Sequence, residues 1–394
     1  MSLSPPAYDL AAWRSRIPLA TEMVLMQNCS QTPQCDRTRA AADAYLDSWR
    51  TAGMDWDSWV EEVEAAKLEF ARLVKATPAE VGLSSSVSDA TSSLASALVP
   101  REGRNKIVLT EAEFPGVAHV WVAAQRYGFE LAWVPLRDGI VRLEDYDDYI
   151  DERTLLVSAT HVYYQNGFRQ DVAAIAKKAH DAGALIYVDA YQSAGCVPID
   201  VKAMDVDILS AGNLKFLFGV PGVAFLYVKE DLLPQMEPAR TGWFGRSDVF
   251  AFNPRLLDWA PTAARFETGT PPVIAAYIAR AGMSVVNEVG VENIRAWTKQ
   301  LAGLAAEAGR ARGLVQEGPA DPELRNPTTA FLVPGGDSHL AEALMRKRGV
   351  LSPARGPVLR FAPHFYSTPE DVEAALDAFV SVLESDEFRK GGHG

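Results

Sequence analysis

Short apolar segments alternate with helical ones along the middle of the chain, between Ile107 and Val228. The candidate strands are Ile107–Thr110, Glu130–Val134, Leu155–Ala159, Leu185–Asp189, Ile208–Ser210 and Val223–Val228. Several are rich in Val, Ile and Leu, which is typical of strands covered on both faces. Helical stretches such as Val117–Arg126 and Val172–Ala182 lie between them. This alternation predicts an α/β fold with a mostly parallel sheet, whose ligands bind at the carboxyl ends of the strands.

The pattern changes on either side of this region. Trp59 to Val74 has apolar residues at helical spacing, with Asp57 as a candidate cap. After Pro254 we expect two strands and three helical segments: helix 272–311, strand 328–333, helix 338–348, strand 358–361 and helix 370–383. We therefore predict a large domain over residues 30–255. A smaller α+β unit, with an interdomain helix, would comprise residues 1–29 and 256–394.

Composition excludes several classes of function. The formal charge of −13 over 394 residues argues against general nucleic-acid binding, which needs basic surfaces. The longest apolar runs are too short to cross a membrane. Three cysteines give neither a disulfide framework nor a zinc pattern, and the six histidines lack ligand spacing, so we expect no metal site. The first residues have no secretion-signal pattern, and we expect a cytoplasmic protein.

An aspartate and a lysine follow two successive predicted strands. Asp189 ends the segment Leu185–Asp189, and Lys215 follows Ile208–Ser210 in a loop bounded by Gly219. The segment around Lys215 is almost free of charge, and an amine in apolar surroundings has a lowered pKa and becomes a nucleophile. Pyridoxal 5′-phosphate (PLP) needs such an amine for a Schiff base and a carboxylate for its ring nitrogen. The alternatives are a surface lysine and an aspartate that caps a turn.

Four further segments supply the remaining contacts that PLP and a substrate require. The serine-rich stretch 83–94, with Val87 and Ser88, can form a phosphate cup where a helix begins. Phe114 can stack on the cofactor ring, and Gln192 can reach the phenolic oxygen of the cofactor. Arg360 interrupts an apolar strand and can bind a substrate carboxylate through two parallel hydrogen bonds. The alternatives are a helix cap for the serines, core packing for Phe114, a loop hydrogen bond for Gln192 and an internal salt bridge for Arg360.

With these residues assembled, the chain resembles the class V aminotransferase family of fold-type I PLP enzymes from about Asn28 to Leu383. The family includes cysteine desulfurases, kynureninases and isopenicillin N epimerase-like proteins. The block from Asp189 to Lys215 and the glycine-led strand 222–228 carry the likeness. The resemblance implies Lys215 as the Schiff-base lysine, Asp189 at the pyridinium, Phe114 stacked on the ring and Arg360 at the substrate carboxylate. It also implies a homodimer with shared active sites.

The most similar local motifs are those of kynureninases. Tyr164, in the segment 160–167, occupies the place of a tyrosine that binds the cofactor phosphate in that group. Trp243, in Gly242–Gly245, resembles a tryptophan that donates to a phosphate across the dimer interface. Thr270, in the Gly-Thr-Pro turn, would play a similar part.

Two departures from the family templates bear on the reaction. Kynureninases usually have histidine where this chain has Gln192, and tyrosine where it has Leu214; desulfurases have histidine at the second position. Desulfurases also carry a cysteine on the loop before the Arg360 equivalent, and the segment 349–356 contains none. Persulfide chemistry of the desulfurase kind is therefore not expected.

These features predict a PLP-dependent enzyme that forms a Schiff base with a small α-amino acid and carries out transamination or a related Cα or Cβ lyase reaction. A kynureninase-like hydrolase that cleaves a Cβ–Cγ bond is one alternative, and a non-enzymatic PLP-binding sensor is another. The sequence leaves the substrate, the stereochemistry and the fate of the electrons open.

Overall fold

A seven-stranded sheet forms the centre of the computed structural model, which describes residues 3–100, 103–335 and 337–391. Its strand order is β2-β8-β7-β6-β5-β3-β4. The bounds are β2 Val81–Ser84, β3 Lys106–Thr110, β4 Glu130–Val134, β5 Thr154–Thr160, β6 Leu185–Asp189, β7 Ile208–Gly212 and β8 Ala224–Val228. The strands from β4 to β7 are parallel, and β8 is antiparallel to both β7 and β2. The predicted α/β fold with a mostly parallel sheet is therefore confirmed.

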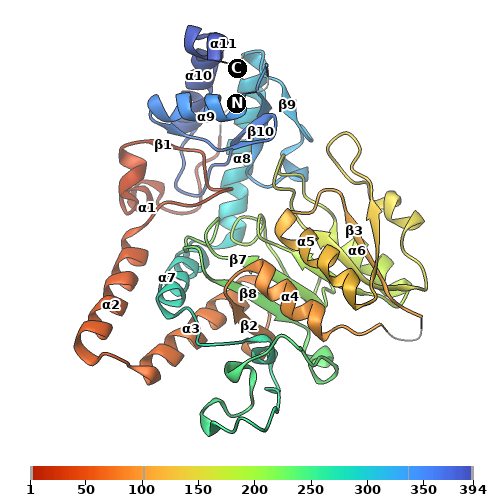
Figure 1. Cartoon of the computed structure of the whole chain (residues 1–394). Helices are drawn as coiled ribbons and strands as arrows, with labels where there is room; N and C mark the ends of the chain where they lie inside the picture. Colours follow the sequence, from red (N-terminus) through yellow and green to blue (C-terminus); the bar gives the residue numbers. More distant parts are fainter. Residues whose placement is uncertain (1–2, 101–102, 336, 392–394) are drawn as a thin grey trace.

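Helices cover both faces of this sheet (Figure 1). On one face α4 (Val87–Ala97) and α5 (Pro115–Ala124) share a core with the strands. On the other face α3 (Trp56–Val74), α6 (Val172–Asp181) and α7 (Val273–Val289) share a second core with them. Each central strand is thus buried on both sides, which explains its near-continuous apolar sequence.

A second layer of structure follows the sheet in the chain. Helix α8 (Val291–Ala311) leads into a four-stranded antiparallel sheet in the order β12-β13-β10-β9. The strands are β9 Gln316–Glu317, β10 Thr329–Leu332, β12 Ala354–Arg355 and β13 Val358–Phe361. Helices α9 (Ser338–Lys347) and α10 (Pro369–Glu384) pack on it, and α11 (Asp386–Gly391) follows.

The N-terminal segment packs with this second layer. Strand β1 (Val24–Leu25) pairs in parallel with β11 (Val350–Leu351), and Leu3 packs against the core cluster that contains Phe388 of α11. From there α1 (Leu10–Ser15) and α2 (Asp36–Ala52) lead towards α3. The domain boundaries themselves stay a prediction, and their extreme ends, residues 1–2 and 392–394, lie outside the described residues.

Two local expectations were wrong, and one strand of the central sheet was not predicted. The predicted helix from Trp59 begins at Trp56, because Asp55, not Asp57, accepts a hydrogen bond from the Ser58 amide and caps it. The single run 272–311 is two helices, separated at Gly290, whose φ of 84° ends α7. Strand β2 was missed because its four residues include a glycine and a serine.

In the part of the chain that the structure describes, no helix combines the length and apolarity that crossing a bilayer requires.

Candidate active site

Lys215 lies in the turn that follows β7, at the carboxyl edge of the parallel strands. The Thr32 hydroxyl donates to the Lys215 carbonyl at 2.8 Å and fixes the backbone of the turn from the N-terminal segment. The amine lies over the Tyr191 ring, 4.1 Å from its centre, and 5.6 Å from the centre of the Phe114 ring. Gly212 makes this arrangement possible, because a Cβ there would lie 2.0 Å from Cζ of Tyr191.

The surroundings of Lys215 favour a neutral amine. Burial lowers its pKa from 10.5 to about 8, and the positive charges of Arg360 and Arg355 act in the same direction against the attraction of Asp189. The Nζ atom forms no hydrogen bond or ion pair with any residue that the structure describes. An unpaired amine with this pKa is the form in which lysine attacks a carbonyl group.

Asp189 stands at the end of β6 and is almost fully buried. Its Oδ1 accepts a hydrogen bond from the Tyr191 amide at 2.9 Å, while no described residue donates to Oδ2. Burial raises the pKa of Asp189, and the Tyr191 amide and Lys215 oppose that effect. A buried carboxylate of this kind favours a cationic partner at its open oxygen.

A second carboxyl group, Glu113, lies close to Asp189. Burial and the negative charge of Asp189 hold the pKa of Glu113 well above its usual range. Two neighbouring buried carboxyl groups do not both ionise. Asp189 is therefore the negative charge of the site, and Glu113 keeps its proton.

Phe114 and Tyr164 form one wall of the site. Phe114 directly precedes α5 and meets Tyr164 edge to face, with ring centres 5.2 Å apart. Phe114 is 39% exposed, so part of its surface is accessible to a ligand. The geometry is compatible with the stacking role predicted for Phe114, and it excludes the alternative that Phe114 is plain core.

The start of α4 provides unpaired backbone amides. The Ser86 hydroxyl caps the helix by accepting from the Asp89 amide at 3.0 Å. The amides of Val87 and Ser88 have no acceptor among the described residues, so they are open to an anion. The acidic Asp89 in this turn is paired with Arg240, which neutralises its charge.

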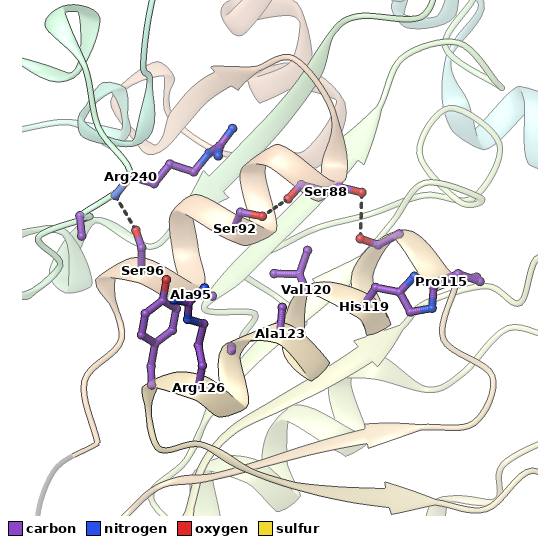
Figure 2. Close-up of a pocket in the computed structure, with 14 residues that line it drawn as sticks. Ser88, Ser92, Ala95, Ser96, Pro115, His119, Val120, Ala123, Arg126 and Arg240 are labelled. Carbon is purple, nitrogen blue, oxygen red and sulfur yellow. Dashed lines mark hydrogen bonds between the residues drawn. The ribbon is translucent and has the colours of Figure 1, made fainter.

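The Ser88 hydroxyl donates to the Gly116 carbonyl at 2.8 Å and joins α4 to α5 beside Phe114. A cavity of about 640 Å³ opens between these two helices (Figure 2). Serine side chains of α4 face Val120 and Ala123 of α5 across it. Neither Lys215 nor Asp189 lines this cavity, so it adjoins the candidate site rather than forming it.

Arg360 reaches the site from β13 and is 1% exposed. Its guanidinium donates to the Tyr164 carbonyl at 2.6 Å and to the Ser30 hydroxyl at 3.0 Å, and its Nε is buried without an acceptor. Burial lowers the pKa of Arg360. No carboxylate among the described residues pairs with Arg360, so the internal salt bridge considered from the sequence is absent there.

The Gln192 side chain contacts the N-terminal segment beside Ser30, to whose hydroxyl Arg360 donates. Its Nε2 donates to the Cys29 carbonyl at 3.1 Å, whereas its Oε1 is buried without a donor. The loop hydrogen bond proposed as its simpler role is present, and one polar atom is still unsatisfied. Such an atom is the kind of group that a bound ligand satisfies.

Trp243 and Thr270 lie together, away from these residues. The Phe244 amide donates to the Thr268 carbonyl at 3.2 Å, which brings the two segments side by side. The Trp243 ring packs against Trp56 and Phe252, and Thr270 is exposed. Within the described part of one chain neither side chain is in hydrogen-bonded or aromatic contact with the residues around Lys215. Their roles across a dimer interface stay predictions.

Several residues of the site were not predicted from the sequence: Cys29, Ser30, Glu113, Tyr191 and Arg355. Tyr191 lies within the block from Asp189 to Lys215, two residues after the end of β6, and its position there was a usable signal. Cys29 and Ser30 come from the N-terminal segment, and no local pattern connects them with Lys215. Their proximity depends on how distant segments pack.

Comparisons with known proteins give a family, two sequence relatives and a structure of similar fold. The family model "Aminotransferase class-V" matches residues 30–373. The chain is 38% identical over 371 residues to "Uncharacterized aminotransferase YcbU" of Bacillus subtilis (strain 168), covering 94% of this chain and 97% of that protein. It is 28% identical to a kynureninase of Pseudomonas fluorescens, covering 86% of this chain and 81% of that one. The apo structure of a cysteine desulfurase from Thermococcus onnurineus NA1 superposes with a TM-score of 0.84, at 23% identity, covering 98% of this chain and 100% of that one.

Proposed function

The chain belongs to the class V aminotransferase family of enzymes, and from this premise we propose that it is a PLP-dependent enzyme that acts on an α-amino acid by transamination or by a related Cα or Cβ lyase reaction. One observation carries the proposal. The Lys215 amine is unpaired among the described residues, has a pKa lowered to about 8 against the attraction of the buried Asp189 carboxylate, and lies 4.1 Å from the centre of the Tyr191 ring and 5.6 Å from that of Phe114.

The residues present fit PLP, the cofactor that class V aminotransferases use. The open amides of Val87 and Ser88 suit its phosphate, and the free oxygen of Asp189 suits a protonated ring nitrogen. The partly exposed Phe114 ring suits the flat ring of the cofactor, and Lys215 suits the aldehyde. When bound, PLP supplies an electron sink for the electrons released when a bond at Cα breaks.

Each side chain of the site then has its own role in the proposed reaction. Arg360 binds the substrate carboxylate, for which its unpaired Nε and its fixed guanidinium are prepared. Lys215, neutral in an appreciable fraction of molecules near neutral pH, would take the proton from Cα and, for transamination, deliver it to the carbon of the cofactor that bears the Schiff base rather than back to Cα. Asp189 keeps the ring nitrogen protonated. Phe114 holds the plane of the ring and excludes water from one side.

Transamination is favoured over kynureninase-like hydrolysis. The aminotransferase relative is 38% identical, against 28% for the kynureninase. The side chains of Gln192 and Leu214 also replace the polar groups that kynureninases present at these positions. Desulfurase chemistry lacks its loop cysteine, and Cys29 is 1% exposed and lies in the N-terminal segment instead.

We further propose a homodimer with shared sites. Trp243 and Thr270 have phosphate-binding counterparts in the resemblance, yet they lie apart from Lys215 in their own chain. A second copy would bring them to the site. Cytoplasmic localisation likewise stays a prediction.

The products of the PLP-loaded enzyme test the proposed reaction. The enzyme is incubated with a panel of amino acids, with and without a 2-oxo acid, and the products are identified. We expect the amino group to pass to the cofactor and then to the 2-oxo acid. Ammonia with pyruvate would instead mark a lyase, and anthranilate from kynurenine would mark the hydrolase. Failure to convert any amino acid would overturn the proposal.

A further inference from the structure

A second arginine shares a face of the β12–β13 hairpin with Arg360. In the antiparallel pairing Arg355 lies opposite Val358, and the Arg360 amide donates to the Pro353 carbonyl at 3.1 Å. Residues two apart on a strand point to the same side, so Val358 and Arg360 share one face. Arg355, directly across from Val358, shares it as their diagonal neighbour. Such diagonal pairs lie about 7–8 Å apart, within reach of long side chains.

That face is directed at the active site. The other face carries Ala354, Leu359 and Phe361, which pack in the core with α9 and α10. The Arg360 side is therefore turned away from this core, and it meets Tyr164 and Ser30. Arg355 projects from the same side at the solvent-exposed end of the hairpin.

The charge of Arg355 is not balanced within the described residues. Among the residues that the structure describes, its guanidinium makes one hydrogen bond, to the carbonyl of its neighbour Ala354 at 3.3 Å, and no ion pair. Glu342 of α9 is the nearby carboxylate, but it accepts from the Ala354 amide at 3.2 Å and contacts His339 at 3.6 Å. The positive charge of Arg355 also contributes to lowering the pKa of both Lys215 and Arg360, which is consistent with its proximity to them.

The site thus has more fixed positive charge than one substrate carboxylate requires. Arg360 is assigned to the α-carboxylate under the proposed function, and Arg355 is left with an open guanidinium on the same face. We propose that Arg355 binds a second carboxylate, at the end of the substrate side chain, so that the preferred substrates are acidic α-amino acids of the aspartate and glutamate type. This inference rests on the proposed function, because it places the substrate between Lys215 and Arg360.

The two carboxylates of such a substrate are joined by a short carbon chain, and two guanidiniums on neighbouring strands can hold both. A planar guanidinium binds a carboxylate through parallel hydrogen bonds, which makes the pair selective for the acid over the isosteric amide. Each charge-assisted hydrogen bond that the amide fails to make costs affinity. We therefore expect discrimination of about 10-fold to 100-fold between each acid and its amide.

Binding to the PLP-loaded enzyme tests this assignment. L-aspartate and L-glutamate, each paired with its amide, are titrated against the enzyme while the visible absorbance of the cofactor is followed. The wild type should bind each acid about 10-fold to 100-fold more tightly than its amide. Arg355→Gln should lose this preference and leave affinity for the amides within about twofold. Arg355→Lys, which keeps the charge and loses the planar fork, should fall between them.

A matched control separates charge loss at the site from charge loss at the surface. Arg346 on α9 is exposed and has no ion pair with the described residues, so Arg346→Gln should leave all four affinities unchanged. Equal affinity of the wild type for acids and amides would overturn the inference, as would an equal loss for both in Arg355→Gln. Either result leaves the proposed function standing. If no amino acid changes the cofactor absorbance, the proposed function itself fails and this inference fails with it.

Discussion

The lowered pKa of Lys215 has a measurable effect on the stability of the protein without PLP. The difference between 10.5 and about 8 is about 2.5 pKa units. At 1.36 kcal/mol per unit this is about 3 kcal/mol of unfavourable free energy whenever the buried amine carries its proton. The protonated Lys215 amine lowers the stability of the folded protein by this amount, because the unfolded chain binds the proton more tightly than the folded one.

The sign of the pH dependence follows. Well below pH 8 the amine is mostly protonated in both states, and nearly the full cost is present. As pH rises from about 8 to 10.5 the folded state loses its proton first, so stability increases relative to a variant without the amine. Lys215→Met should therefore stabilise the PLP-free protein by about 3 kcal/mol near pH 7, a gain that shrinks by about 2 kcal/mol by about pH 9.5.

Urea unfolding of the PLP-free proteins at the two pH values measures this difference. Titrating groups that do not interact with Lys215 act equally on both proteins and cancel from the comparison. Since Lys215 also attracts Asp189, the comparison of Lys215 with Lys215→Met is repeated in proteins that carry Asp189→Asn. There the stability gained by Lys215→Met at neutral pH should be larger. Exposed Lys347→Met is the control and should change stability by less than about 0.5 kcal/mol at either pH. A Lys215→Met effect independent of pH would refute the argument that burial lowers the pKa of Lys215.

Three further changes have defined outcomes. Arg360→Lys should raise KM for the amino acid substrate about 10-fold to 100-fold with a smaller change in kcat, and steady-state kinetics showing an unchanged KM would make the arginine structural. Gly212→Ala should push the Tyr191 ring from its place under the lysine and cost about 1–3 kcal/mol, seen as a lower melting temperature and weaker PLP uptake; wild-type values for both would contradict the close approach. Lys67 Nζ lies 3.2 Å from Oε1 of the buried Glu267, so Lys67→Met should lower the free energy of unfolding by about 3–5 kcal/mol, because it leaves that carboxylate without a partner. Adding Glu267→Gln removes the unpaired charge and should restore most of the loss, measured by urea unfolding.

The fold was largely predictable because the central strands are buried on both faces. Each of the six predicted strands exists, since a run of branched apolar residues between turns has few other places in a globular protein. Strand β2 escaped because Gly82 interrupts it. The structure explains that residue, since a Cβ there would lie 2.5 Å from the Ala263 carbonyl oxygen. Such a contact joins distant segments and leaves no local pattern.

Some residues of the candidate site were likewise predictable from the sequence, and others were not. Asp189 and Lys215 were found because strand ends and an uncharged loop are visible in the sequence. Arg355 was not predicted as a site residue, because the segment 349–356 was considered only for the cysteine that it lacks. The pairing of Arg355 with Val358 in the hairpin places it on the same face as Arg360. Glu113 reads as an ordinary loop acid, and only burial beside Asp189 gives it a retained proton. Electrostatic environments of this kind arise from packing, which a single sequence does not specify.

The central claim is that Lys215 is the residue that holds PLP. Borohydride reduction of the PLP-loaded protein, followed by peptide mapping by mass spectrometry, tests it most directly. We predict that the pyridoxyl group is found on Lys215, and that Lys215→Ala keeps the fold but gains no label. A label on any other lysine, or none after reduction of the loaded wild-type protein, would contradict the account.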